Sequence, residues 1–223
     1  MRGIFITGTD TAVGKTTIGV HLAKTLRQNG QRVRVRKPVE TGCEKLAGSD
    51  VLQPPDAIQL RAAAGVMEAL EAVCPYRYEP PVSPEWAARL ANRPLEIGDL
   101  HAACLDGVGN DDFLLVEGTG GFYSPIARGA LNADLAAGLG MPVLLVVPDR
   151  LGAVNQTLLA IEAMKMRGLP LMGVVLNQIA HPENPFLDNH ADLQRWLTAP
   201  VIHQTYNSPA NPQLTLWVQK WLG

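Results

Sequence analysis

The stretch Ile4-Phe5-Ile6-Thr7-Gly8-Thr9-Asp10-Thr11-Ala12-Val13-Gly14-Lys15-Thr16-Thr17 decides the fold of this 223-residue chain. Its apolar start predicts a buried strand. In residues 16–29, Ile18, Leu22 and Leu26 recur every four positions, on one face of a helix. The glycines between strand and helix let backbone N–H groups surround phosphate oxygens, and the first turn of a helix adds partial positive charge. We therefore predict a phosphate-binding loop at residues 8–17.

Two side chains of this loop indicate a magnesium–nucleoside triphosphate. Lys15 is placed to reach the terminal phosphates, and the hydroxyl of Thr16 is placed to bind Mg²⁺. The loop departs from the commonest spacing at Thr9, where glycine or alanine is usual. The alternative is a glycine-rich turn that joins a strand to a helix without a ligand.

The remainder of the chain alternates between apolar runs and amphipathic stretches. Residues 113–116, 143–147 and 172–176 predict strands covered on both faces, and residues 152–167 and 213–222 predict helices. Residues 32–39 predict one further strand, with Arg32, Arg34 and Arg36 on its polar face. This alternation predicts a single α/β domain over residues 1–223, with a mostly parallel β-sheet flanked by helices on both faces. Ligands of such sheets bind beyond the carboxyl ends of the strands.

Composition excludes several classes of protein. A formal net charge of −2 disfavours nucleic-acid binding, which needs clustered Lys and Arg. The longest apolar run, residues 141–148, is much shorter than the roughly 20 residues that span a bilayer. Three widely spaced cysteines match neither a disulfide framework nor a zinc site, and the N-terminus has no signal-peptide pattern. We expect a cytoplasmic protein that binds no nucleic acid and no membrane.

Three charged residues outside the loop are candidates for the same site. Glu117 follows the apolar run 113–116, where a carboxylate points into the ligand crevice, although a helix cap or a surface acid would also fit. Asp56 precedes residues 57–60 and is equally a candidate helix cap and a metal ligand. Lys37 is in register with the buried valines of its strand, so it either meets an anion or extends to the surface.

Together these residues resemble the dethiobiotin synthetase family of P-loop NTPases. The matching motifs are Gly-Thr-Asp-Thr-x-Val-Gly-Lys-Thr at 8–16, Lys-Pro-Val-x-x-Gly at 37–42, Asp-Ala at 56–57, Val-Glu-Gly-x-Gly-Gly at 116–121 and Leu-Gly-x-x-Asn at 151–155. A strand that ends in Asn177 completes the set. The resemblance covers residues 3–178 in the right order.

The resemblance implies a homodimeric, ATP-dependent cyclo-ligase of biotin biosynthesis. Its substrates would be 7,8-diaminopelargonic acid, CO₂ and ATP, with Mg²⁺ as the cofactor. One amine of the substrate captures CO₂ as a carbamate, and a carbamate oxygen attacks the γ-phosphate. The second amine then displaces phosphate from the mixed anhydride and closes the ureido ring of dethiobiotin. Such a reaction depends on positioning and on charge neutralisation.

The resemblance also implies a role for each matching position. Lys37, Lys15 and Thr11 would be catalytic, and Thr16, Asp56 and Glu117 would hold Mg²⁺. Thr41, Lys37, Gly118 and Asn155 would bind the substrate, with Asn155 and the amides opening its helix receiving the substrate carboxylate. The nucleotide would contact Ala12, Val13, Gly14, Lys15, Thr16, Thr17, Asp56, Glu117, Gly118, Thr119, Gly120, Asn177 and Gln178, with Asn177 reading the adenine.

Two other functions remain open at this point. A nucleotide-dependent switch of the ParA/MinD kind usually carries a second lysine early in the loop, where this chain has Thr9, Asp10 and Thr11. Its membrane-bound version ends in a basic amphipathic helix, whereas the last predicted helix here has one lysine, Lys220. The other alternative is a related amidoligase-type synthase that acts on a different amine or acid.

Overall fold

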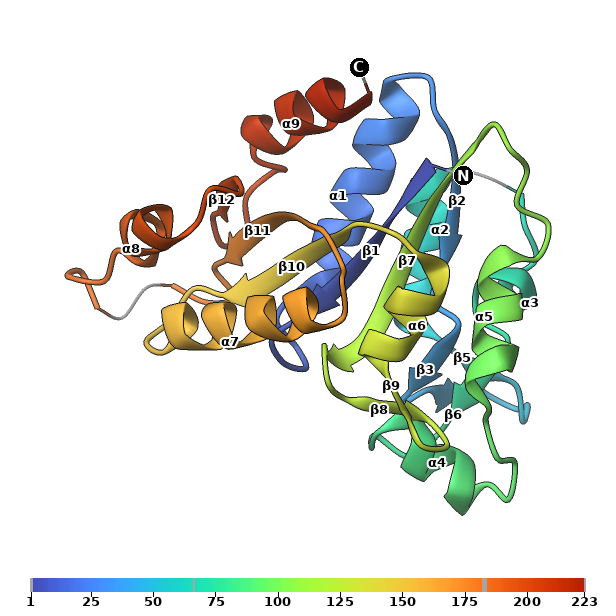
Figure 1. Cartoon of the computed structure of the whole chain (residues 1–223). Helices are drawn as coiled ribbons and strands as arrows, with labels where there is room; N and C mark the ends of the chain where they lie inside the picture. Colours follow the sequence, from blue (N-terminus) through green and yellow to red (C-terminus); the bar gives the residue numbers. More distant parts are fainter. Residues whose placement is uncertain (1, 66, 182–183, 223) are drawn as a thin grey trace.

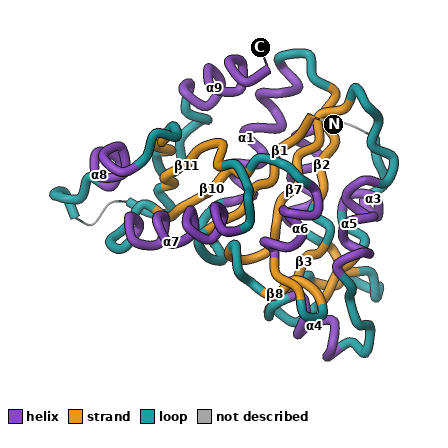
Figure 2. Tube along the Cα trace, in the orientation of Figure 1, coloured by secondary structure: helices purple, strands orange, loops and turns teal. Residues whose placement is uncertain are grey.

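A six-stranded parallel sheet forms the centre of the molecule, with strand order β12-β11-β10-β1-β7-β2. The computed structural model describes residues 2–65, 67–181 and 184–222. Figure 2 shows the strands as a central layer between helices. The strands are β1 (Arg2–Gly8), β2 (Arg32–Arg36), β7 (Asp112–Gly121), β10 (Val143–Pro148), β11 (Leu171–Asn177) and β12 (Val201–Gln204). The predicted parallel sheet is confirmed.

Helices cover both faces of this sheet, as predicted. Successive strand residues point to opposite sides, and the strands carry buried apolar side chains on both. Ile4 and Ile6 of β1 pack in one core cluster with the helices that cover one face, whereas Phe5 belongs to the cluster on the other face. Figure 1 shows α1 on the opposite side of the sheet from α6 and α7. The first cluster includes side chains of α1 (Lys15–Gln28), α2 (Pro55–Ala64) and α9 (Pro212–Leu222). The second includes side chains of α5 (Ile97–Leu105), α6 (Asn132–Leu139), α7 (Ala153–Met166) and α8 (Asn189–Trp196).

Shorter elements complete the chain at the carboxyl end of the sheet and along its edge. β3 (Val39–Thr41) pairs in parallel with β6 (Tyr76–Tyr78). Two small hairpins are built by β4 (Glu44–Lys45) with β5 (Leu52–Gln53) and by β8 (Pro125–Ala127) with β9 (Ala130–Leu131). The remaining helices are α3 (Leu70–Val73) and α4 (Pro84–Leu90). Among the described residues, no helix combines the length and the apolar character needed to cross a membrane.

The prediction of one strand over residues 32–39 is wrong. The chain leaves the main sheet after Arg36, where the backbone N–H of Lys37 donates to the carbonyl of Val73 at 2.9 Å. Pro38 has no N–H to donate to a neighbouring strand, and the next strand, β3, starts in a separate two-stranded sheet. This break turns Lys37 away from the ladder of the main sheet.

The prediction that Arg36 lies on a polar face is also wrong, because its side chain is fully buried. Its guanidinium donates to both carboxylate oxygens of Glu68, at 3.2 and 3.3 Å, and to the carbonyl of Asp106 at 2.7 Å. Arg34 also pairs with Glu68, at 2.9 Å. A buried guanidinium is tolerated only with such partners, so the interior of the protein contains an ion-pair network beside β2.

Candidate active site

The phosphate loop occupies the turn between β1 and α1, as predicted. Gly14 ends it with φ = 89°, a left-handed conformation that glycine adopts without steric cost. Ala12 has φ = 57°, which costs a non-glycine residue about 1 kcal/mol. α1 begins at Lys15, so the free N–H groups of its first turn face the loop. The loop is therefore shaped to present backbone donors to an anion.

Lys15, at the end of this loop, is almost fully buried. Its Nζ donates to the carbonyl of Asp10 at 2.9 Å. Burial, together with the positive charge of Lys37, lowers the pKa of Lys15 to about 8. A second lysine close enough to lower the pKa of Lys15 adds to a region of positive potential that favours a multiply charged anion.

Lys37 and Glu117 meet where β2 ends beside the middle of β7. Arg36 of β2 lies opposite Val116 of β7, so the residues that follow them emerge side by side. Lys37 Nζ lies 2.6 Å from Glu117 Oε1 and 3.2 Å from Asp56 Oδ2, and it donates to the carbonyl of Gly118 at 3.3 Å. The four residues come from three separate parts of the sequence, and the fold brings them to one point.

Lys37 does not extend to the surface, since only 2% of it is exposed. Burial alone would lower its pKa, but the carboxylates of Glu117, Asp56 and Glu40 outweigh that effect and raise the pKa above the usual value for lysine. The ammonium group is therefore charged at neutral pH, and its charge is held inside the protein.

Three oxygen-bearing side chains fit a magnesium ion. Thr16 Oγ1 donates to Glu117 Oε1 at 2.9 Å, and the other oxygen of that carboxylate, Oε2, is buried without a hydrogen-bond partner among the described residues. The carboxylate of Asp56 belongs to the same cluster, because its Oδ2 lies 3.2 Å from Lys37 Nζ. Mg²⁺ prefers hard oxygen ligands, uses few carboxylates and keeps several waters. A carboxylate oxygen buried without a partner is the feature that such a cation would satisfy.

The alternative reading of Asp56 as a helix cap is wrong. Pro54 occupies the N-cap position of α2, and Pro55 begins the helix. The free N–H groups of Asp56 and Ala57 instead donate to the two carboxylate oxygens of Glu40, at 2.9 and 3.1 Å. Glu40 thus caps a helix from another part of the chain, and this leaves the carboxylate of Asp56 free to face Lys37.

Most of the predicted residues line one cavity of about 330 Å³. They are Thr11, Ala12, Gly14, Lys15, Thr16, Thr17, Lys37, Thr41, Asp56, Thr119 and Gly120. Sequence reasoning missed two further lining residues, Glu40 and Gln59. The available signal for Glu40 was an acid inside the motif Lys37-Pro38-Val39-Glu40-Thr41-Gly42. Burial raises the pKa of Glu40 to about 7, although Lys37 and the amides that it accepts from oppose that rise.

A second cavity, of about 420 Å³, adjoins the first and shares Gly14 and Thr17 with it. Asn177 and Gln178 line it, as the resemblance implies for a base-binding pocket, together with residues 204–208. The amide of Asn177 donates to the carbonyl of Val13 at 2.9 Å. Sequence reasoning missed His21 and Tyr206 in this cavity, since neither carries a motif.

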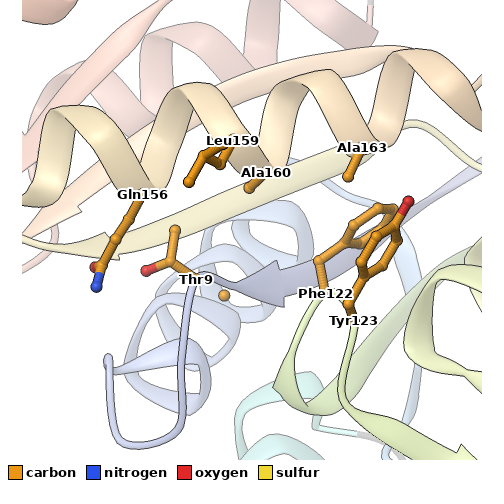
Figure 3. A pocket seen from close by; sticks show the side chains of 8 residues that line it. Thr9, Phe122, Tyr123, Gln156, Leu159, Ala160 and Ala163 are labelled. Carbon is orange, nitrogen blue, oxygen red and sulfur yellow. The ribbon is translucent and has the colours of Figure 1, made fainter.

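Val13, Glu117 and Gly118 line neither cavity but contact residues that do: Val13 binds Asn177, and Glu117 and Gly118 bind Lys37. Asn155 has no such contact among the described residues. It lies in the first turn of α7, it is exposed, and it lines neither of these cavities. The same helix borders a separate, largely apolar cavity of about 390 Å³ (Figure 3). Its lining residues are Gly8, Thr9, Phe122, Tyr123, Gln156, Leu159, Ala160 and Ala163.

A parallel sheet whose interior strand β1 runs through a phosphate loop into a helix, beside a buried lysine–carboxylate cluster, defines a P-loop nucleotide-binding enzyme fold. A family model described as an AAA domain matches residues 2–208. The ATP-dependent dethiobiotin synthetase BioD of Ruthia magnifica is 45% identical over 80% of this chain and 81% of its own length. The corresponding protein of Anaeromyxobacter dehalogenans is 40% identical over 87% and 85%. The chain belongs to the dethiobiotin synthetase family.

Solved structures agree on the fold alone. A ParA family ATPase from Chlorobium tepidum superimposes with a TM-score of 0.55 and 13% identity, over 99% of this chain and 90% of that one. The septum site-determining protein MinD from Pyrococcus horikoshii gives a TM-score of 0.53 and 20% identity, over 96% and 85%. At these identities the likeness extends to the α/β architecture and does not carry the switch function to this chain.

Proposed function

We propose that this protein is an ATP-dependent dethiobiotin synthetase that closes the ureido ring from 7,8-diaminopelargonic acid and CO₂. The observation that carries the proposal is the ammonium of Lys37, buried between Glu117 and Asp56 in a cavity that also contains the phosphate loop. The family to which the chain belongs supports it, because its members carry the same activity in their names.

In the proposed reaction, an amine of the substrate loses a proton and bonds to the carbon of CO₂ to form a carbamate. A carbamate oxygen then attacks the γ-phosphorus of ATP, ADP leaves, and a carbamic–phosphoric anhydride forms. The second amine attacks the carbonyl carbon, phosphate leaves, and a second proton is lost as the ring closes. Each of the first two steps concentrates negative charge near the γ-phosphate.

Lys15 and Lys37 would neutralise that charge without having to reorganise, since both ammonium groups are already buried at the cavity. The hydroxyls of Thr11 and Thr41, which line the same cavity, would bind the substrate beside them. Thr16, Asp56 and Glu117 would hold Mg²⁺, which would supply further positive charge to the triphosphate when bound. The second cavity, with Asn177 and Gln178, would take the base of ATP.

The homodimer belongs to this proposal as well. Asn155 is exposed and lines neither the phosphate-loop cavity nor the adjoining cavity of its own chain, so it and the N-terminal turn of α7 would act on the substrate carboxylate in a partner subunit. Leu151 is 83% exposed and Leu159 is 64% exposed, and the cavity between α7 and the start of the phosphate loop is mostly apolar. An apolar surface next to a polar helix terminus suits a contact between two copies of this chain. Because the reaction consumes ATP and the three cysteines are free and buried, we place the enzyme in the cytoplasm.

The test is ATP turnover with and without 7,8-diaminopelargonic acid and bicarbonate, with dethiobiotin followed by mass. We expect dethiobiotin, ADP and phosphate in equal amounts. ATP hydrolysis that is indifferent to the diamine would contradict the proposal. Product formed from a different amine would favour a related synthase of the same fold.

A further inference from the structure

We infer that Glu40 is a positioning residue that holds Asp56 in the magnesium-binding orientation by capping α2 from outside the helix. Glu40 lies in β3, sixteen positions before Asp56, and is 4% exposed. The inference rests on the proposed magnesium-dependent nucleotide site, but it does not depend on which amine the enzyme uses.

The helix α2 has an unusual start. A helix leaves its first N–H groups without partners inside the helix, and a side-chain oxygen at the N-cap usually accepts from one of them. Here the N-cap is Pro54, which has no such oxygen, and Pro55 at the first position has no N–H. The first two N–H groups that need a partner are therefore those of Asp56 and Ala57. Both donate to Glu40, one to each oxygen.

The hydrogen bond to Glu40 acts on the residue that faces Lys37. The residue whose N–H is bound to Glu40 Oε1 is the same residue whose side chain lies 3.2 Å from Lys37 Nζ. Two hydrogen bonds to adjacent amides fix both the position and the rotation of the helix start, because they remove the freedom of that turn to pivot. The direction in which the Asp56 carboxylate leaves the helix is then fixed too.

The charges around Lys37 also favour this role for Glu40. A helix N-terminus carries a partial positive charge, and a carboxylate beside it is stabilised. Glu40, Asp56 and Glu117 converge on the same buried lysine, so in the absence of the helix terminus Glu40 would add to the mutual repulsion of the other two acids. Binding to two amides satisfies Glu40 and lets it remain in this cluster without itself being a metal ligand.

The test measures nucleotide binding, which needs no turnover. The affinity for a fluorescent ATP analogue is determined at a series of free Mg²⁺ concentrations for the wild type, Glu40→Gln, Glu40→Ala, Asp56→Ala and the double variant. We expect Glu40→Ala to raise the Mg²⁺ concentration for half-maximal binding about tenfold, the usual effect of removing a group that orients a metal ligand. Glu40→Gln keeps one acceptor oxygen, so its Mg²⁺ concentration for half-maximal binding should lie between those of the wild type and Glu40→Ala.

The double variant distinguishes positioning from a general loss of stability. If Glu40 acts through Asp56, Glu40→Ala has no further effect on Mg²⁺ dependence once Asp56 is alanine. Asp188→Ala is the matched control, since it removes a cap from α8 by deleting the oxygen that accepts from the N–H of Ala191 at 2.9 Å. It should leave the Mg²⁺ titration unchanged.

Two outcomes would overturn the inference: a wild-type Mg²⁺ titration for both Glu40 variants, or additive effects in the double variant. If Glu40→Ala does not fold, the titration of Glu40→Gln tests the inference: a raised Mg²⁺ requirement supports it, and a wild-type titration overturns it. Failure of dethiobiotin formation, with Mg²⁺ coupling intact, would instead contradict the proposed reaction and leave the role of Glu40 standing.

Discussion

Lys37 Nζ and Glu117 Oε1 lie 2.6 Å apart, although 80 residues separate them in the chain. Both side chains are buried, and the carboxylate also accepts from the hydroxyl of Thr16. The lysine that would stabilise the reacting phosphoryl group therefore donates to the acid that would hold the metal, at the same oxygen atom that accepts from Thr16. A substitution of Lys37 or of Glu117 therefore changes the surroundings of the other residue as well, so each variant needs separate measurements of turnover, binding and stability.

For Lys37→Ala, we expect ligation to fall by about 10² to 10³, the usual effect of removing a preorganised charge at the reacting group. ATP binding should change little, because Lys15 and the loop amides remain. The loss also leaves Glu117 buried without its cation, so we expect a stability decrease of about 3 kcal/mol. Turnover, nucleotide binding and urea denaturation measure the three effects. Lys45→Ala, at an exposed lysine, is the control. Turnover near the wild-type rate would remove Lys37 from the mechanism.

For Glu117→Gln, we expect Mg²⁺ dependence to weaken, because the amide keeps the shape of the side chain but not its charge. The Mg²⁺ concentration for half-maximal ATP turnover should rise about tenfold or more. The control is Glu162→Gln, an exposed glutamate on α7. An unchanged magnesium titration for Glu117→Gln would exclude this residue from the metal site.

For the dimer, mixing two inactive variants gives a test that a single chain cannot pass. Lys37→Ala removes a residue of the subunit's own cavity, and Asn155→Asp would repel the substrate carboxylate from the partner's side. In a mixed dimer, one of the two sites has both wild-type residues. We expect an equal mixture to recover roughly one quarter of wild-type activity after subunit exchange, since about half of the dimers are mixed. No recovery in mixtures shown by sedimentation to be dimeric would place Asn155 in its own subunit's site, whereas full activity of Asn155→Asp alone would place it outside the site.

For pH, His21 gives a prediction about stability. Burial, with a further contribution from Lys24, lowers the pKa of His21 below its ordinary value of 6.5. The unfolded chain therefore binds a proton at pH values where the folded protein does not, so the free energy of unfolding should fall as pH decreases below about 6.5. Urea midpoints at pH 7.5 and 5.5 measure this fall. His21→Gln, which cannot take up the proton, should reduce the difference between the two midpoints. An equal difference in both proteins would show that other groups cause it.

The residues that sequence reasoning located best are those defined by position along a strand. Lys37 could be placed because it follows Val33 and Val35 on the buried side, and Glu117 because it follows a buried apolar run, although β2 ends before Lys37 and β7 continues past Glu117. The loop residues followed from a motif with a known backbone shape. Their roles in catalysis remain predictions, although the cavity that collects them was foreseen.

The residues that sequence reasoning misjudged depend on partners far away in the chain. Arg36 looks like a surface residue until Glu68 and the carbonyl of Asp106 are brought beside it. Asp56 stays open between helix cap and metal ligand until Pro54 is seen at the N-cap position and Glu40 is seen to accept from the N–H of Asp56. No local pattern encodes these pairings, because they are made by the closing of the tertiary structure.

The contact between Asn177 and Val13 joins the two halves of the proposed nucleotide site. The amide of Asn177 ties the end of β11 to the carbonyl of Val13, so the wall of one cavity is joined to the loop that borders the other. In the proposed site, the spacing between base and phosphates would therefore be set before ATP binds. The enzyme would then select a nucleotide by its length as well as by its chemistry.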